Sequence, residues 1–225
     1  MVFSNKRSMI DIELTIDDNK IHSTSQTKFL GVIIDEKLNW NKHISHITSK
    51  VARGIGIIIK ARKFLPRDAI LSLYYSFIYP YLTYCNLIWG NACATHLERL
   101  KILQKKAVRI IAGVTPRTHS DPLFKQLKLL KINEINIFLT ACFMFKVSNC
   151  MIIEIFQNLF VKNSEIHGHL TRQSAEYHIP IVHTESAKRN IRFHGVKTWN
   201  DLMKKGISKD CSEAVFKKNL KKLLI

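Results

Sequence analysis

Apolar and polar side chains alternate along the first 36 residues. The apolar positions of the first run lie two residues apart, at Ile10, Ile12, Leu14 and Ile16. A period of two predicts a strand with one buried face. Residues 17–20 are Asp, Asp, Asn and Lys, a typical turn composition, and residues 21–24 and 27–34 are expected to supply the returning strands. Because residues 29–34 are almost all apolar, we expect that strand to be covered on both faces.

After Trp40 the apolar residues recur at steps of three and four, which predicts an amphipathic helix. The predicted core stripe of this helix is Ile44, Ile47, Val51, Ile55 and Ile58. Basic residues lie off this stripe. Gly54 and Gly56 interrupt the helix, and they either weaken it or permit close packing against a neighbour.

Prolines and a glycine mark the limits of the next two helices. Pro66 opens the first of them, and Pro80 is expected to kink or end it. The second is expected over residues 95–112, and Gly113 stops it. Its predicted core stripe is Leu97, Leu100, Leu103, Ala107, Ile110 and Ile111.

The second half of the chain is also predicted to be helical. Shorter helices are expected over residues 121–130 and 132–149, and the tail is helical and basic over 195–202 and 212–224. Residues 163–190 are polar and are expected to form an extended linker. The predicted fold class is therefore mainly α with a small N-terminal antiparallel β portion. Three domains are expected: 1–36, 37–115 and 116–225.

The charge of the chain changes the functional picture most. The 225 residues carry 35 Lys and Arg against 17 Asp and Glu, which gives a net charge of +18. A folded domain with this imbalance favours an anionic partner, nucleic acid first and an acidic membrane surface second. No uncharged run is long enough to span a bilayer, and nucleic acid rather than a membrane is the expected partner. Five cysteines without a paired motif indicate reduced thiols of an intracellular protein, with nucleus or cytoplasm left open.

Basic residues on the wet faces of the predicted helices are the candidate nucleic-acid contacts. They are Lys42, Lys50, Arg53, Arg99, Lys101, Lys105, Lys106 and Arg109. The alternative is that these charges are only the solvated side of amphipathic helices. A cluster of aromatic residues raises a similar question: Tyr74, Tyr75, Tyr79, Tyr81, Tyr84 and Trp89. Stacking on bases is one interpretation of that cluster, but the interleaved Leu and Ile favour a core role.

Candidate catalytic groups are few. Asp17-Asp18 is the only pair of adjacent aspartates, and its neighbours are typical of a turn rather than of a metal site. His43 and His46 have the i, i+3 spacing of a helical metal pair, but no further ligand accompanies them. We expect that pair to be solvated or to face phosphate. Residues 167–169 (His-Gly-His) have the same shortcoming, and no metal or catalytic residue is predicted.

The junction between the two halves of this pattern is similar to that of a known family. Residues 29–35 read Phe-Leu-Gly-Val-Ile-Ile-Asp, followed by Leu-Asn-Trp at 38–40 and His-Ile at 43–44. With these residues in this order, the stretch resembles the palm-to-thumb junction of reverse transcriptases from non-LTR retrotransposons, in particular the jockey-like elements. The resemblance continues in order through later blocks, at residues 79–84, 89–90, 100–109, 121–124, 171–172, 195–200 and 216–218.

The resemblance implies roles for parts of the chain. Phe29, Leu30 and Gly31 would form the primer grip, and the helices up to residue 112 would be the thumb, which follows the primer–template backbone without reading sequence. Residues 116–225 would be the C-terminal region of these elements. The partners implied are RNA, an RNA–DNA hybrid or the DNA backbone, together with the palm and fingers of a polymerase.

The position of the junction bears on activity. In the family the catalytic aspartates precede it, and here only 28 residues do, so Met1 is expected to be an internal methionine. Residues 2–5 (Val-Phe-Ser-Asn) resemble the strand just after those aspartates. Although the family is one of RNA-directed DNA polymerases, this chain alone is expected to be inactive, and Mg²⁺ is expected only for the full-length polymerase. The alternatives are a helical protein-interaction module and a non-functional transposon-derived fragment.

Overall fold

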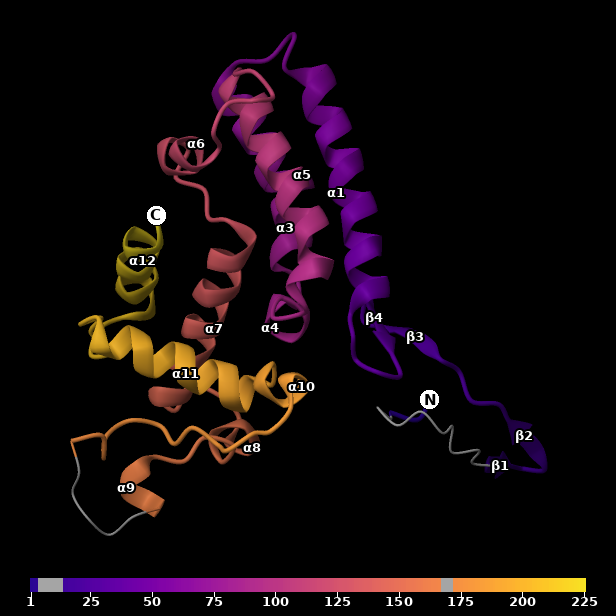
Figure 1. Cartoon of the computed structure of the whole chain (residues 1–225), viewed down its shortest axis with the longest axis vertical. Coiled ribbons are helices and arrows are strands. Elements are labelled where there is room, and N and C mark those ends of the chain that lie inside the picture. Colours follow the sequence, from indigo (N-terminus) through magenta and orange to yellow (C-terminus); the bar gives the residue numbers. More distant parts are fainter. Residues whose placement is uncertain (4–13, 167–171) are drawn as a thin grey trace. The chain divides into compact units, whose positions relative to one another are not determined.

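A computed structural model describes residues 1–3, 14–166 and 172–225. These residues form twelve helices and four short strands, and the strands all lie near the N-terminus (Figure 1). The predicted mainly α fold with a small antiparallel β portion is therefore confirmed. Several expectations fall outside the described residues: the strand positions Ile10 and Ile12, the loop pair His167 and His169, and parts of two family-like blocks, residues 4–5 and 171.

The chain divides into two compact units. Unit 1 consists of Met1–Tyr81 and Ala92–Ala107, and unit 2 of Leu82–Asn91 and Val108–Ile225.

Two antiparallel hairpins open unit 1. The first joins β1 (Leu14–Ile16) to β2 (Asn19–Ile21), and the second joins β3 (Gln26–Phe29) to β4 (Val32–Asp35). Each has a two-residue turn with positive φ at both positions, 46° and 60° in the first, 45° and 82° in the second. Such turns match the right-handed twist of paired strands, which explains why the chain reverses there.

The hairpin turns correct two expectations from the sequence. Residues 29–34 are not one strand, because the chain turns at Leu30-Gly31 and pairs Phe29 with Val32. That strand is also not covered on both faces, since Phe29 is exposed and the residues of β4 after Val32 are only half-buried. The buried face expected for the first strand is also wrong for its described part, where every residue of β1 is exposed.

Asp35 links the second hairpin to helix α1 (Asn41–Ala61). Its Oδ1 accepts from the backbone N–H groups of Lys37 and Asn39, each at 3.1 Å, and its Oδ2 accepts from the N–H of Trp40 at 3.0 Å. The turn is tight, with positive φ at Leu38 and Trp40. Trp40 precedes α1 without a side-chain cap, so the Asp35 carboxylate satisfies one of the donors left open near the helix start.

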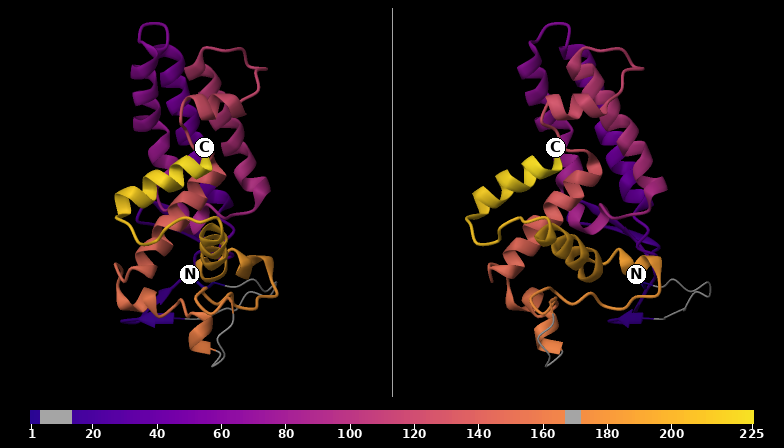
Figure 2. Two further views of the ribbon diagram at one scale, coloured as in Figure 1. Left: turned by 90° about the vertical axis from the view of Figure 1, so that its left-hand side faces the viewer. Right: turned by 60° about the vertical axis from the view of Figure 1, so that its left-hand side comes forward.

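Helix α1 packs against α2 (Arg67–Phe77) along the predicted stripe (Figures 1 and 2). All five stripe residues of α1, from Ile44 to Ile58, are buried. The two glycines of α1 were expected either to weaken the helix or to permit close packing. A Cβ built at Gly54 would lie 2.8 Å from the Phe77 carbonyl oxygen. Gly54 therefore permits close packing of the two helices, whereas a Cβ at Gly56 would meet nothing within 4 Å.

The boundaries predicted for the next helices are confirmed. α2 ends at Phe77, and Pro80 lies in the first turn of α3 (Tyr79–Thr83). α5 (Ala94–Ala112) ends before Gly113, whose φ is +73°.

The stripe predicted for α5 needs correction. Four of its residues are buried, but Leu103 and Ile110 are only half-buried. Gln104 and Val108 are buried instead. Gln104 is a polar residue that the core tolerates because its amide donates to the Tyr74 hydroxyl at 3.0 Å.

Unit 2 is built around α7 (Ile132–Ser148), which packs against α11 (Ile191–Lys204) and α12 (Glu213–Leu224) (Figure 2). The rings of Phe145 and Phe216 stack at a centroid distance of 4.4 Å, and Trp199 lies 5.9 Å from Phe216. Shorter helices complete the unit: α4 (Asn86–Trp89), α6 (Asp121–Gln126), α8 (Glu154–Gln157), α9 (Asn163–Ile166) and α10 (Glu185–Lys188).

A polar network crosses the core of unit 2. The Asn136 amide donates to Asn86 Oδ1 at 2.9 Å, and Asn136 Oδ1 lies 3.1 Å from His194 Nε2, so that imidazole donates. Burial lowers the pKa of His194, and the nearby Lys197 lowers it further, which favours the neutral ring. Gly90 leaves room for this network, since a Cβ there would lie 2.6 Å from Asn136 Nδ2 and even closer to Asn86 Oδ1.

The stretch 163–190 is anchored at its middle. Tyr177 is buried, its N–H donates to Asn200 Oδ1 at 3.2 Å, and its carbonyl accepts from Asn200 Nδ2 at 2.8 Å. Its ring also contacts Phe160. The composition alone does not show this anchor, because it depends on one aromatic residue and one distant asparagine.

Candidate nucleic-acid interface

Helix α1 presents a line of cations on the side opposite its core stripe. Lys42, His46, Lys50, Arg53 and Lys60 follow one another at steps of three, four and seven, so they share one face of the helix. Lys42, Arg53 and Lys60 are exposed, and His46 and Lys50 are half-buried. From Lys42 to Lys60 this face extends about 27 Å at about 1.5 Å per residue. We call these five residues the α1 basic stripe.

Lys28 on β3 adds a cation that the sequence did not single out. The pKa of His46 is lowered first by burial and then by the positive charges of Lys50, Lys28 and Arg53. Lys28 therefore lies close enough to the α1 basic stripe to act on the same imidazole. Pairing with Ile33 across the hairpin fixes the position of Lys28, and that register depends on the turn at Leu30-Gly31.

The family-like residues Phe29, Leu30 and Gly31 form the apex of the second hairpin. The side chains of Phe29 and Leu30 are 62% and 73% exposed. Leu30 has φ of 45°, a left-handed conformation that costs a non-glycine residue about 1–2 kcal/mol. The structure thus displays two apolar side chains on a strained, tightly defined turn.

His43 holds this hairpin against α1. Its Nδ1 accepts from the backbone N–H of Ile33 at 3.2 Å, which requires the neutral ring with its proton on Nε2. Burial is the main cause that lowers the pKa of His43 to about 4, and His46 contributes. The expectation that the two histidines are solvated or face phosphate is therefore wrong for His43, which is only 2% exposed.

The candidate basic residues on α5 differ in their exposure and in the contacts that they make within the chain. Arg99 and Lys106 are exposed, and Lys105 is half-buried. Lys101 lies 3.6 Å from the Glu98 carboxylate. Arg109, which belongs to unit 2, donates its Nε to the Thr118 carbonyl at 2.7 Å. The three residues of the first group are thus the more available cations of this helix.

The aromatic cluster contains both core and surface residues. Tyr74 and Trp89 are fully buried, as a core role predicts. Tyr75, Tyr81 and Tyr84 are exposed. The ring of Tyr75 meets that of Tyr74 edge-on at 5.8 Å, so packing against a neighbouring ring accounts for its position.

The described residues offer little for metal or small-molecule chemistry. They contain no group of three His, Cys, Asp or Glu able to hold a metal ion. Asp17 and Asp18 are the two turn residues of the first hairpin, which does not fit the site of a two-metal polymerase. None of the helices in the described ranges is both long and apolar enough to cross a membrane.

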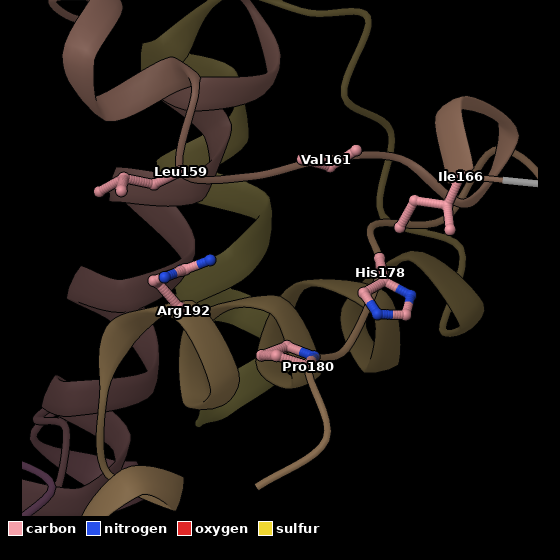
Figure 3. A pocket seen from close by; sticks show the side chains of 6 residues that line it. All are labelled: Leu159, Val161, Ile166, His178, Pro180 and Arg192. Atoms are coloured by element: carbon pink, nitrogen blue, oxygen red, sulfur yellow. The ribbon is translucent and has the colours of Figure 1, made fainter.

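One pocket of unit 2 has a volume of about 80 Å³ (Figure 3). Its lining side chains are Leu159, Val161, Ile166, His178, Pro180 and Arg192. Ligand sites usually measure about 300–1,000 Å³, so this hollow is too small for a nucleotide or a similar molecule.

The fold and the exposed cations define a basic, mainly helical protein with hairpins at its amino end. Comparison with known proteins shows similarity to RNA-directed DNA polymerases of mobile elements. The chain is 28% identical over 125 residues to "Probable RNA-directed DNA polymerase from transposon X-element" of Drosophila melanogaster, a match that covers 54% of this chain and 14% of that protein. The resemblance to reverse transcriptases of jockey-like retrotransposons is thereby confirmed over about half of the chain.

Two polymerases of the jockey element give similar matches. The Drosophila funebris protein is 29% identical over 124 residues, covering 54% of this chain and 14% of the relative. The Drosophila melanogaster protein is 32% identical over 111 residues, covering 48% and 12%. The matched region thus spans about one seventh of the length of these curated relatives. No family model matches the chain, and no solved structure matches it.

Proposed function

We propose that this chain is a reverse-transcriptase-derived region that binds the backbone of RNA, an RNA–DNA hybrid or DNA without reading its sequence. The observation that carries the proposal is the α1 basic stripe with Lys28 at one end. Among the described residues, no carboxylate forms an ion pair with Lys28, Lys42, Lys50 or Arg53. These cations are available to an external anion.

The dimensions of the stripe suit a nucleic-acid backbone. One strand of a duplex carries a phosphate about every 3.4 Å along the axis, so about 27 Å corresponds to roughly eight phosphates. Phosphate contacts of this kind position a protein on a duplex but carry no sequence information. We therefore expect affinity that depends on salt and charge and varies little between sequences.

The family resemblance adds a role for the hairpin apex. The exposed Phe29 and Leu30, with Gly31, form the proposed primer-grip-like contact at a primer terminus, and residues 37–115 form the proposed thumb. His43 and Asp35 fix the orientation of this apex relative to α1. The apex and the stripe would then contact the same duplex.

We further propose that the chain alone does not transfer nucleotides. That reaction depends on carboxylates that hold two metal ions, and Asp17-Asp18 in a hairpin turn does not supply such a site. The test is primer extension by the purified chain with Mg²⁺ or Mn²⁺ on an RNA template. No extension is expected, and extension that disappears when both aspartates are replaced would contradict the assignment of this chain to binding alone.

The binding proposal is tested by charge removal at matched sites. A triple variant, Lys42→Gln, Lys50→Gln and Arg53→Gln, should weaken binding to an RNA–DNA duplex at low salt. The control removes three lysines from α12, with Lys218→Gln, Lys221→Gln and Lys222→Gln, for the same change in net charge. If both triple variants lost affinity equally, net charge rather than the α1 basic stripe would explain binding.

A second candidate function rests on the apolar surface of the hairpins. Leu14, Ile16 and Ile21 are exposed on the first hairpin, and Phe29 and Leu30 are exposed on the second. Exposed apolar patches with short open strands are typical of surfaces that recruit another protein. We propose the palm and fingers of a polymerase as the partner for this surface. A stoichiometric complex that survives nuclease treatment would support this role, and its loss with nuclease would oppose it.

A further inference from the structure

The turn that joins α1 to α2 has an unusual surface. Phe64 is 84% exposed and its neighbour Leu65 is 44% exposed. The segment 60–67 also contains four exposed cations, Lys60, Arg62, Lys63 and Arg67, and no acidic residue. Within the described residues these four cations form no ion pair.

The backbone of this turn is well defined. The N–H groups of Phe64 and Leu65 both donate to the Ala61 carbonyl at 3.0 Å, and the N–H of Arg62 continues the helix by donating to Ile58. Pro66 then starts α2, with the N–H of Ile70 donating to its carbonyl at 3.1 Å. The turn lies at the end of the helix pair α1–α2 (Figure 1), so Phe64 is carried on a hydrogen-bonded segment of backbone.

We propose that this turn binds an unpaired stretch of nucleic acid, with a base stacked on Phe64 and the flanking phosphates on Lys60, Arg62, Lys63 and Arg67. The inference rests on the proposed function, because it extends the α1 basic stripe to its far end. An aromatic ring surrounded by cations is the combination that binds single strands without sequence preference. Inside a duplex the faces of each base are already stacked, so the ring requires an unpaired base.

The position of the turn along α1 favours nucleic acid over an anionic membrane, for which the same residue types are also suited. Lys60 is both the last residue of the α1 basic stripe and the first cation of the turn. A duplex that follows the stripe from Lys42 would reach the turn after roughly eight phosphates. Its single-stranded extension would then meet Phe64.

The test uses the full chain and three probes. The first is a blunt RNA–DNA duplex of about 12 base pairs, and the second is the same duplex with a single-stranded extension of about eight nucleotides. The third is a vesicle of phosphatidylcholine with phosphatidylserine as the anionic lipid. The variants are Phe64→Leu, which removes the ring, and Phe64→Trp, which keeps one. Phe77→Leu is the matched control, an equal change at a partly exposed position of α2 in the same unit.

We expect Phe64→Leu to weaken binding to the extended duplex about tenfold and to leave binding to the blunt duplex unchanged. Phe64→Trp should retain the affinity, and its added fluorescence should be quenched by the extended duplex. Phe77→Leu should behave as the unmodified chain. Because Phe64 is so exposed, its replacement should not affect folding, which circular dichroism checks.

Three results would overturn the proposal. The first is equal affinity of Phe64→Leu and the unmodified chain for the extended duplex. The second is loss of vesicle binding in Phe64→Leu while nucleic-acid binding is unchanged, which would assign the turn to a membrane. The third is an extension that adds nothing to the affinity of the unmodified chain. In each of these cases salt-dependent binding of the blunt duplex would leave the proposed function standing, whereas absence of all nucleic-acid binding would remove both.

Discussion

The two glycines of α1 provide a matched test of how this helix packs. Gly54→Ala and Gly56→Ala make the same chemical change two residues apart on one helix. A Cβ at position 54 would lie 2.8 Å from the Phe77 carbonyl oxygen and 3.0 Å from Ile78 Cγ1. A Cβ at position 56 would meet nothing within 4 Å. Opposite effects on stability are therefore expected.

The magnitudes follow from two terms. Alanine is favoured over glycine inside a helix by about 1 kcal/mol, which raises the free energy of unfolding at both positions. At position 54 the obstacle is a backbone carbonyl of α2, so the helices must move apart, and overpacking of this kind costs about 1–3 kcal/mol. We expect Gly56→Ala to be stabilised by about 0.5–1 kcal/mol and Gly54→Ala to be destabilised by about 1 kcal/mol.

Urea unfolding followed by circular dichroism at 222 nm measures this difference, which should be about 2 kcal/mol between the two variants. The native chain is the common reference. If Gly54→Ala were as stable as Gly56→Ala, the close approach of α1 and α2 would not exist in solution, and the packing described for unit 1 would be wrong.

Three further predictions concern the histidines and the core of unit 2. The pKa of His43 is about 4 in the folded chain against 6.5 for the free side chain, so the unfolded state binds the proton first as pH falls. Between pH 6.5 and pH 4 the free energy of unfolding of the native chain should therefore fall by up to about 3 kcal/mol relative to that of His43→Gln. Urea unfolding at several pH values measures this, and an equal pH dependence in the two proteins would refute it. Gly90→Ala should lower the melting temperature markedly, because its Cβ displaces the Asn86–Asn136 hydrogen bond; an unchanged melting curve would show that the network can move aside. Bound nucleic acid should raise the pKa of His46 by offsetting its cationic neighbours, so NMR titration should show proton uptake on binding, and an unchanged pKa would place the ligand elsewhere.

The sequence was most informative where one physical rule decided the outcome. The apolar residues from Ile44 to Ile58 recur at a spacing that places them on one face of a helix, and all five of them are buried. Gly113 and Pro80 end helices for local steric reasons that no tertiary contact needs to supply. These elements could be predicted from the residues alone.

The predictions from the sequence were wrong or incomplete where tertiary contacts or a strained backbone determined the structure. A leucine at positive φ is disfavoured, so Leu30-Gly31 did not indicate a turn, although the glycine was a usable signal. Gln104 is buried only because Tyr74 offers its hydroxyl. Lys28 belongs to the candidate interface because the register of the second hairpin places it near α1, and the turn at Leu30-Gly31 sets that register.

The central claim is that the α1 basic stripe binds a nucleic-acid backbone. Its most direct test is the salt dependence of affinity for an RNA–DNA duplex, compared between the native chain and the triple variant Lys42→Gln, Lys50→Gln and Arg53→Gln. If these residues contact phosphates, the slope of log affinity against log salt should be smaller in the variant by about 2–3, because each lost phosphate contact removes about 0.7–0.9. An equal slope in the two proteins would contradict the claim.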